Sequence, residues 1–168
     1  MEHGCALSEL IAVMAQETEL YEDLLELAGR KKDVLIEHRI EELKQIVHRE
    51  SEILKRLGKM ELRRAPLLAA LAPSEGDIGS PELSAILPTL DSPEREELNR
   101  IKERLQRTVG EISARNAVNQ KLIETQLQYT SFCIELMTGN HESEGPCGYS
   151  ANINHPRPLA FSLLDQKV

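Results

Sequence analysis

Histidine, cysteine and the acidic residues are the side chains that hold metals, and this sequence spreads its histidines and cysteines too widely for a metal site. The five histidines are His3, His38, His48, His141 and His155, and no two are four residues apart on one predicted helix face. His141 and Cys147 lie in the same segment, but a structural zinc site normally needs four ligands. We therefore predict no metal and no cofactor.

Paired carboxylates, which could serve acid–base catalysis, occur at Glu41-Glu42 and Glu96-Glu97. Basic residues follow acidic ones at helical spacing, as Arg56 follows Glu52, which is typical of a solvated helix face. Catalytic carboxylates instead need a dry pocket that shifts their pKa. The sequence also lacks a glycine-rich phosphate loop, a nucleophile elbow and a paired-cysteine motif. These observations predict a protein that is not an enzyme.

Amide side chains interrupt an apolar stripe at Asn116 and Asn119, and Gln126 follows them. A buried amide must be hydrogen-bonded, so these residues could fix the register of a helix or bond to a partner across an interface. The alternative is that both asparagines face solvent, and the sequence leaves the two interpretations open. Tyr21 and Tyr129 lie at helical positions with apolar neighbours, as does Phe132, and we expect all three to pack in a core.

The composition indicates helices and an acidic surface. Of 168 residues, 40% are hydrophobic and 29% charged but just 3% aromatic, which disfavours a β-sandwich or barrel and favours helix. The net charge of −8 disfavours nucleic acid and anionic lipid as partners. No apolar run reaches the ~18 residues of a membrane span, so no membrane insertion is expected.

The cysteines and the first residues predict a cytoplasmic location. Cys5, Cys133 and Cys147 are odd in number and far apart, which is not a disulfide framework. A reducing compartment is the simpler setting for them. Residues 1–6 contain no basic stretch followed by an apolar run, so no signal peptide is evident.

A hydrophobic stripe at helical spacing predicts three long helices, at residues 5–36, 40–71 and 93–138. In the second helix we assign these residues to one apolar face: Leu43, Ile46, Val47, Ile53, Leu54, Leu57, Met60, Leu67, Leu68 and Leu71. A continuous helix from Leu7 to Leu71 would be about 100 Å long, so we expect a break near His38. Pro66 predicts a kink, or an end near Arg64.

The remaining segments are predicted as a connection and a tail. Residues 72–92 are rich in proline and glycine, with a short helical turn opened by Ser80-Pro81-Glu82 and closing at Ile86 or Leu87. Residues 139–168 shift to Gly, Pro, Ser, Asn and His, and we expect a flexible tail after a helical bundle of residues 1–138. The predicted fold class is all-α, an antiparallel three-helix bundle of long helices.

The sequence resembles the FlgN-type flagellar export chaperones along most of its length. The resemblance lies in residues 24–44, from Leu24 to Lys44, and in His48-Arg49-Glu50-Ser51-Glu52-Ile53-Leu54-Lys55-Arg56-Leu57 and Glu61-Leu62-Arg63-Arg64. It continues in Asn119-Gln120-Lys121-Leu122-Ile123-Glu124, in the segment from Phe132 to Gly139, and in the ending Ser162-Leu163-Leu164-Asp165-Gln166-Lys167-Val168 after Tyr149. In the family, Gly-Asp often marks the turn between the first two helices, where this sequence has His38-Arg39.

The resemblance implies a cytoplasmic bacterial chaperone that binds hook–filament junction proteins and delivers them to the export apparatus of flagellar type III secretion. The family's C-terminal part is associated with partner binding. An exposed apolar groove can accept an amphipathic segment as an added helix. The candidate partner-binding residues are Leu122, Ile123, Tyr129, Phe132, Leu136, Met137, Leu159, Phe161, Leu163 and Leu164. The last four form an apolar cluster that docks either on its own bundle or on a partner.

The alternative interpretation is a non-catalytic coiled-coil scaffold or oligomerisation protein without a client. Amphipathic helices need partner helices, and these can come from a second copy of the chain as well as from a client. A homo-oligomer is therefore compatible with either interpretation.

Overall fold

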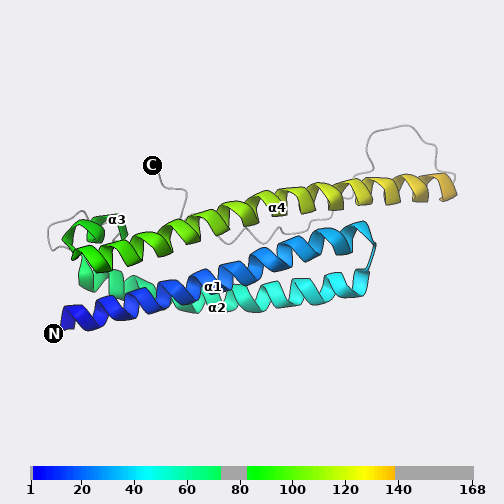
Figure 1. Ribbon diagram of the computed structural model, residues 1–168. Coiled ribbons are helices and arrows are strands. Elements are labelled where there is room, and N and C mark those ends of the chain that lie inside the picture. Colours follow the sequence, from blue (N-terminus) through cyan, green and yellow to red (C-terminus); the bar gives the residue numbers. More distant parts are fainter. Residues whose placement is uncertain (1, 73–82, 139–168) are drawn as a thin grey trace. The chain divides into compact units, whose positions relative to one another are not determined.

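A computed structural model describes residues 2–72 and 83–138, which are helical apart from short connections. The helices of these residues are α1 (Glu2–Ile36), α2 (Ile40–Leu71), the short α3 (Leu83–Ile86) with the 3-10 turn η1 (Leu87–Thr89), and α4 (Ser92–Thr138). Figure 1 shows α1 and α2 side by side, joined at residues 37–39. The chain divides into two units, residues 1–125 and 126–168, so α4 contributes residues to both.

The turn between α1 and α2 is a Schellman motif built without glycine. His38 adopts a left-handed backbone conformation with a φ of 56°. Its N–H donates to the carbonyl of Leu35 at 3.3 Å, and the N–H of Arg39 donates to the carbonyl of Val34 at 3.0 Å. These two bonds satisfy carbonyls that the end of a helix leaves unpaired. The chain therefore reverses at the predicted break, although a histidine occupies the position where glycine is usual.

Within residues 1–125, α1 and α2 pack along a heptad seam. The α1 positions are Leu7, Leu10, Met14, Glu17, Tyr21, Leu24, Ala28, Lys31 and Leu35, and the α2 positions are Leu43, Ile46, Glu50, Ile53, Leu57, Met60, Arg64, Leu67 and Leu71. The spacing alternates between three and four residues, which keeps one face of each helix toward the other. Two ion pairs replace apolar layers: Lys31 Nζ lies 2.6 Å from Glu50 Oε2, and Arg64 Nε lies 3.2 Å from Glu17 Oε1.

The first part of α4 packs on this hairpin and runs in the same direction as α1. Arg104 forms a bidentate pair with Glu22, at 2.6 and 2.7 Å. Farther along α4, Asn119 donates an Nδ2 hydrogen to the carbonyl of Ala28 at 2.9 Å. The buried apolar side chains form two clusters. One contains Leu24, Leu57 and Ile112. In the other, the start of α1 and the end of α2 pack against Ile86 and Leu98. The antiparallel three-helix bundle expected from the sequence is thereby confirmed.

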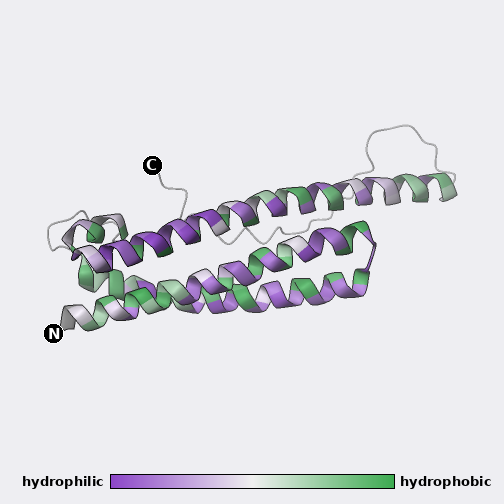
Figure 2. Ribbon diagram, in the orientation of Figure 1, coloured by the Kyte–Doolittle hydropathy of each residue, from purple (hydrophilic) through white to green (hydrophobic). Residues whose placement is uncertain are grey.

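One sequence-based assignment within α2 is wrong. Val47 and Leu54, which we assigned to the inner face, are 52% and 38% exposed and lie on a different side of the helix from Ile46 and Ile53. Figure 2 shows hydrophobic and hydrophilic residues alternating along α2. α2 spans the predicted residues 40–71: it continues through Pro66 to Leu71, so the end near Arg64, one of the two effects considered for Pro66, does not occur. Burial of Leu68 and Leu71 beyond the proline offsets the lost backbone hydrogen bond.

The connection before α4 contributes one core residue. The short turn predicted through Ile86 or Leu87 is present as α3 and η1, and Ile86 is completely buried. Ser80, Pro81 and Glu82, which we expected to open that turn, lie outside the described residues. Among residues 2–72 and 83–138, no helix combines the length and apolar character that crossing a bilayer requires.

Candidate functional site

The C-terminal part of α4, residues 126–138, carries large apolar side chains that solvent reaches. Tyr129 is 69% exposed, Leu136 is 55% exposed and Met137 is 86% exposed. Glu135 is the single charged residue in this stretch. Figure 2 shows the hydrophobic residues in the last turns of the helix. A helix surface of this composition favours contact with another apolar surface, because charged residues would otherwise cover it.

The exposed surface continues the heptad pattern of the α4 core. The seam residues of the first unit are Leu98, Ile101, Leu105, Thr108, Ile112, Arg115, Asn119 and Leu122, and the same alternation of three and four residues reaches Gln126, Tyr129, Cys133 and Leu136. Leu98, Leu105 and Ile112 are buried, whereas Tyr129 and Leu136 are exposed. The sequence therefore specifies a packing face along the whole of α4, and its last heptads expose that face.

The structure divides the predicted partner-binding residues between different faces of α4. Leu122, Tyr129 and Leu136 recur at intervals of seven residues and share the seam. Ile123 is 39% exposed on an adjacent side, and Phe132 is 55% exposed on the opposite flank of the seam. Leu122 is half-buried. The predicted tail residues lie outside the described residues: Leu159, Phe161, Leu163 and Leu164.

Two exposed residues of this surface were missing from the sequence-based assignment. Leu127 is 63% exposed and Ile134 is 56% exposed, and seven residues separate them on the side that also carries Ile123. Their heptad spacing was a usable signal. The expectation that Tyr129 and Phe132 pack in a core is wrong, whereas Tyr21 does pack against the cluster of α1 and α2.

Some polar side chains on this surface find partners within the helix itself. A hydrogen bond between the side chains of Tyr129 and Cys133, one turn apart, raises the pKa of the Tyr129 hydroxyl above its ordinary value of 10.0. Thr130 donates its hydroxyl to the carbonyl of Gln126 at 2.9 Å. This arrangement suits packing against an apolar surface, because the neutral side chains cost little to desolvate.

The two asparagines of α4 have different environments. Asn119 is 2% exposed and bonded to Ala28, while its Oδ1 atom has no partner among the described residues. Asn116 faces solvent. Asn119 therefore fits the interpretation that a buried amide fixes the helix register. Asn116 fits the alternative that the side chain faces solvent.

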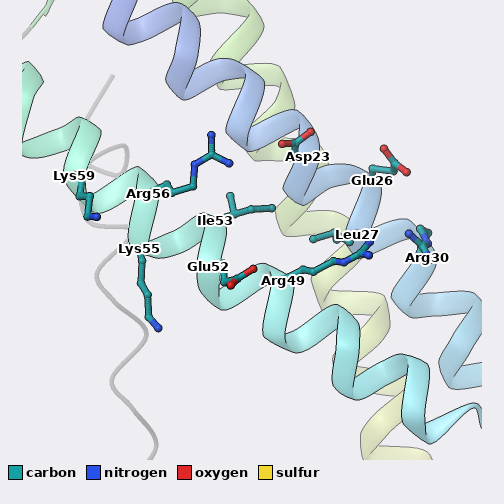
Figure 3. Close-up of a pocket in the computed structure, with 10 residues that line it drawn as sticks. All are labelled: Asp23, Glu26, Leu27, Arg30, Arg49, Glu52, Ile53, Lys55, Arg56 and Lys59. Atoms are coloured by element: carbon teal, nitrogen blue, oxygen red, sulfur yellow. The ribbon is translucent and has the colours of Figure 1, made fainter.

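A second concave surface lies between α1 and α2 and is mostly charged. Figure 3 shows the apolar side chains of Leu27 and Ile53 between the two helices, with charged residues around them. Its lining includes five basic and three acidic side chains: Arg30, Arg49, Lys55, Arg56, Lys59, Asp23, Glu26 and Glu52. Because both charge signs mix in an open, solvated groove, we assign no reaction to it.

Among the described residues, no group of three or more His, Cys, Asp or Glu side chains converges in a way that could hold a metal ion. His141 and Cys147, the pair considered from the sequence, lie outside the described residues.

Comparison with known proteins gives a family match and one relative. A family model described as "FlgN protein" matches residues 1–157 of this chain. A protein of Bacillus subtilis (strain 168) described as "Uncharacterized protein YvyG" is 26% identical over 152 residues, which cover 89% of this chain and 91% of that protein. No solved structure matches.

Proposed function

The chain belongs to the FlgN family of flagellar export chaperones, and on that premise we propose that it binds terminal segments of hook–filament junction proteins through the C-terminal part of α4. In this proposal the protein works in the bacterial cytoplasm and catalyses no reaction. It keeps each client soluble and delivers it to the export apparatus of flagellar type III secretion. The exposed Tyr129, Leu136 and Met137 are the observation that carries the proposal.

The binding step is the addition of a helix to an incomplete packing face. An amphipathic client segment lays its apolar side along the α4 seam and removes the exposed side chains from water. A specific complex of this kind buries ~1,200–2,000 Å² in total. Ordering the client segment costs roughly 2–5 kcal/mol or more of the gross interaction energy, which keeps the complex reversible. Reversibility suits a chaperone, because the client must be released for export.

The proposed surface on α4 comprises the six predicted α4 residues and two additions, Leu127 and Ile134. We propose that Tyr129 is a main anchor, since aromatic side chains dominate interface energetics. The apolar cluster at residues 159–164 is proposed to cover the α4 surface when no client is bound. Deletion of residues 158–168 tests this part, because an unchanged client affinity would show that the tail takes no part in binding.

A mixing experiment distinguishes the proposed chaperone from a scaffold protein that has no client. The full chain is combined with a purified terminal fragment of a junction protein, and the mass of the product is measured by light scattering. A stable 1:1 complex is the expected result for a chaperone. Self-association that the fragment does not change would favour the scaffold and contradict the proposal.

A further inference from the structure

The outer face of α2 carries a second row of exposed apolar residues that the bundle does not use. Ile40, Val47 and Leu54 recur at intervals of seven residues and are 56%, 52% and 38% exposed. Leu62, near the other end of the same face, is 77% exposed. A shallow, mostly apolar groove lies on this face and is lined by Ile40, Leu43, Lys44, Val47, His48 and Ser51. This row belongs to the unit of residues 1–125, whereas residues 126–138 of α4 belong to the other unit.

Small residues alternate with the large ones along this face. Ser51, Gly58 and Ala65 also recur at intervals of seven residues and are exposed. A Cβ atom added to Gly58 would meet no other atom within 4 Å. No described part of the chain therefore requires a glycine in the middle of α2, where glycine is less favourable than alanine. A glycine at such a position permits close approach of a backbone from outside.

We propose that α2 pairs in antiparallel orientation with α2 of a second copy of the chain, about a twofold axis between Glu52 and Ile53. In this register each of the three large apolar residues spaced seven apart faces a small residue of the second copy. Val47 faces Gly58, Ile40 faces Ala65, and Leu54 faces Ser51. The paired stretch, residues 40–65, exceeds the three heptads over which such a pattern indicates a coiled coil. The contact is isologous, so every pair occurs twice.

Charge complementarity selects the same register. The antiparallel pairing places Lys44 opposite Glu61 and Leu43 opposite Leu62 of the second copy. A parallel, in-register pairing would instead oppose Lys44 to Lys44 and Glu61 to Glu61, which is repulsive. In the single chain Lys44 pairs with Glu41 at 2.7 Å, but both side chains are largely exposed, so this pair is weak. Glu61 forms no ion pair within the described part of the chain.

Replacement of Gly58 gives the most discriminating test, because it should raise the stability of the monomer and lower the stability of the dimer. The full chain and its Gly58→Ala variant are compared by sedimentation equilibrium over a range of concentrations and by thermal unfolding at low concentration. We expect the wild type to form a dimer. We expect Gly58→Ala to melt at a higher temperature as a monomer and to dimerise at least tenfold more weakly. A monomeric wild type, or an unchanged dissociation constant in Gly58→Ala, would overturn the proposal.

Charge reversal tests the register. We expect Lys44→Glu and Glu61→Lys each to weaken the dimer at least fivefold, and the double variant to return to within about threefold of wild type. Lys59→Glu is the matched control, since Lys59 lies on α2 but lines the charged groove, and its dimer should be unchanged. A dimer that resists these changes but is lost in Tyr129→Ser would place the interface on α4 and overturn the proposal. A monomer that still binds a junction-protein fragment would overturn the dimer and leave the proposed function intact.

Discussion

Arg64 of α2 places its Nε atom 3.2 Å from Oε1 of Glu17 on α1, and both side chains occupy seam positions that apolar residues would otherwise fill. Two heptads along the hairpin, Lys31 pairs with Glu50 with the charges exchanged between the helices. A slip of two heptads in one direction would oppose Glu17 to Glu50, and a slip in the other direction would oppose Lys31 to Arg64. The two pairs therefore specify the register of the hairpin, as polar seam residues do in coiled coils.

Loss of Arg64 should be costly, because it leaves the carboxylate of Glu17 buried without a counter-charge. The side chain of Glu17 is 5% exposed. We expect Arg64→Met to lower the free energy of unfolding at pH 7 by about 3 kcal/mol, measured by urea denaturation. Arg63→Met is the control. Arg63 pairs with Glu9 at the surface, where both side chains are about half exposed, and its loss should cost under about 1 kcal/mol. Equal costs for the two variants would contradict this account.

Glu17 should also give the stability a pH dependence of known sign. Burial, with a smaller contribution from Glu61, raises the pKa of the Glu17 carboxyl above its ordinary value of 4.5, and Arg64 opposes that shift. The folded state then holds the proton more tightly than the unfolded state, so the free energy of unfolding falls as pH rises from 4.5 through the folded-state pKa. Relative to Glu17→Gln, which cannot titrate, the wild type should lose stability across that window. A gain relative to Glu17→Gln would mean that Arg64 outweighs burial.

His38 should be replaceable by glycine with a gain in stability. Its φ of 56° disfavours any residue with a Cβ atom. We expect His38→Gly to raise the free energy of unfolding by about 0.5–1 kcal/mol, and His38→Val to lower it. Lys32→Gly, an exposed position inside α1, should instead lose about 1 kcal/mol. Denaturant midpoints of the three variants test the ordering, and a loss in His38→Gly would exclude backbone strain at the turn.

Hydrophobic periodicity was sufficient to predict the fold class, because a helical bundle is specified mainly by which residues are apolar and how they are spaced. The break near His38 followed from a length argument alone, since neither glycine nor proline marks it. The Schellman hydrogen bonds of this turn depend on a left-handed backbone conformation. A histidine in the sequence does not predict that conformation. Of the two effects considered for Pro66, an end of the helix near Arg64 does not occur, because core contacts beyond the proline outweigh its local effect.

The candidate site was predicted less completely than the fold. A row of apolar residues at helical spacing does not say which side is covered, so Val47 and Leu54 were placed inside while Leu127 and Ile134 were overlooked. Exposure depends on which helices lie alongside, and that is a property of the assembled bundle. The polar seam residues were ambiguous as well, because Glu17 and Lys31 resemble surface charges until their partners on α2 are known.

We propose that the exposed end of α4 binds a client segment, and calorimetric titration of the full chain with a junction-protein terminal fragment is the decisive measurement. Tyr129→Ser with Leu136→Ser should weaken binding at least thirtyfold, because two exposed anchors of one seam are lost. Val118→Ser, which changes an apolar residue of α4 that is 48% exposed outside this surface, should bind as the wild type does. Equal affinity in all three proteins, with the helical content unchanged, would contradict the claim.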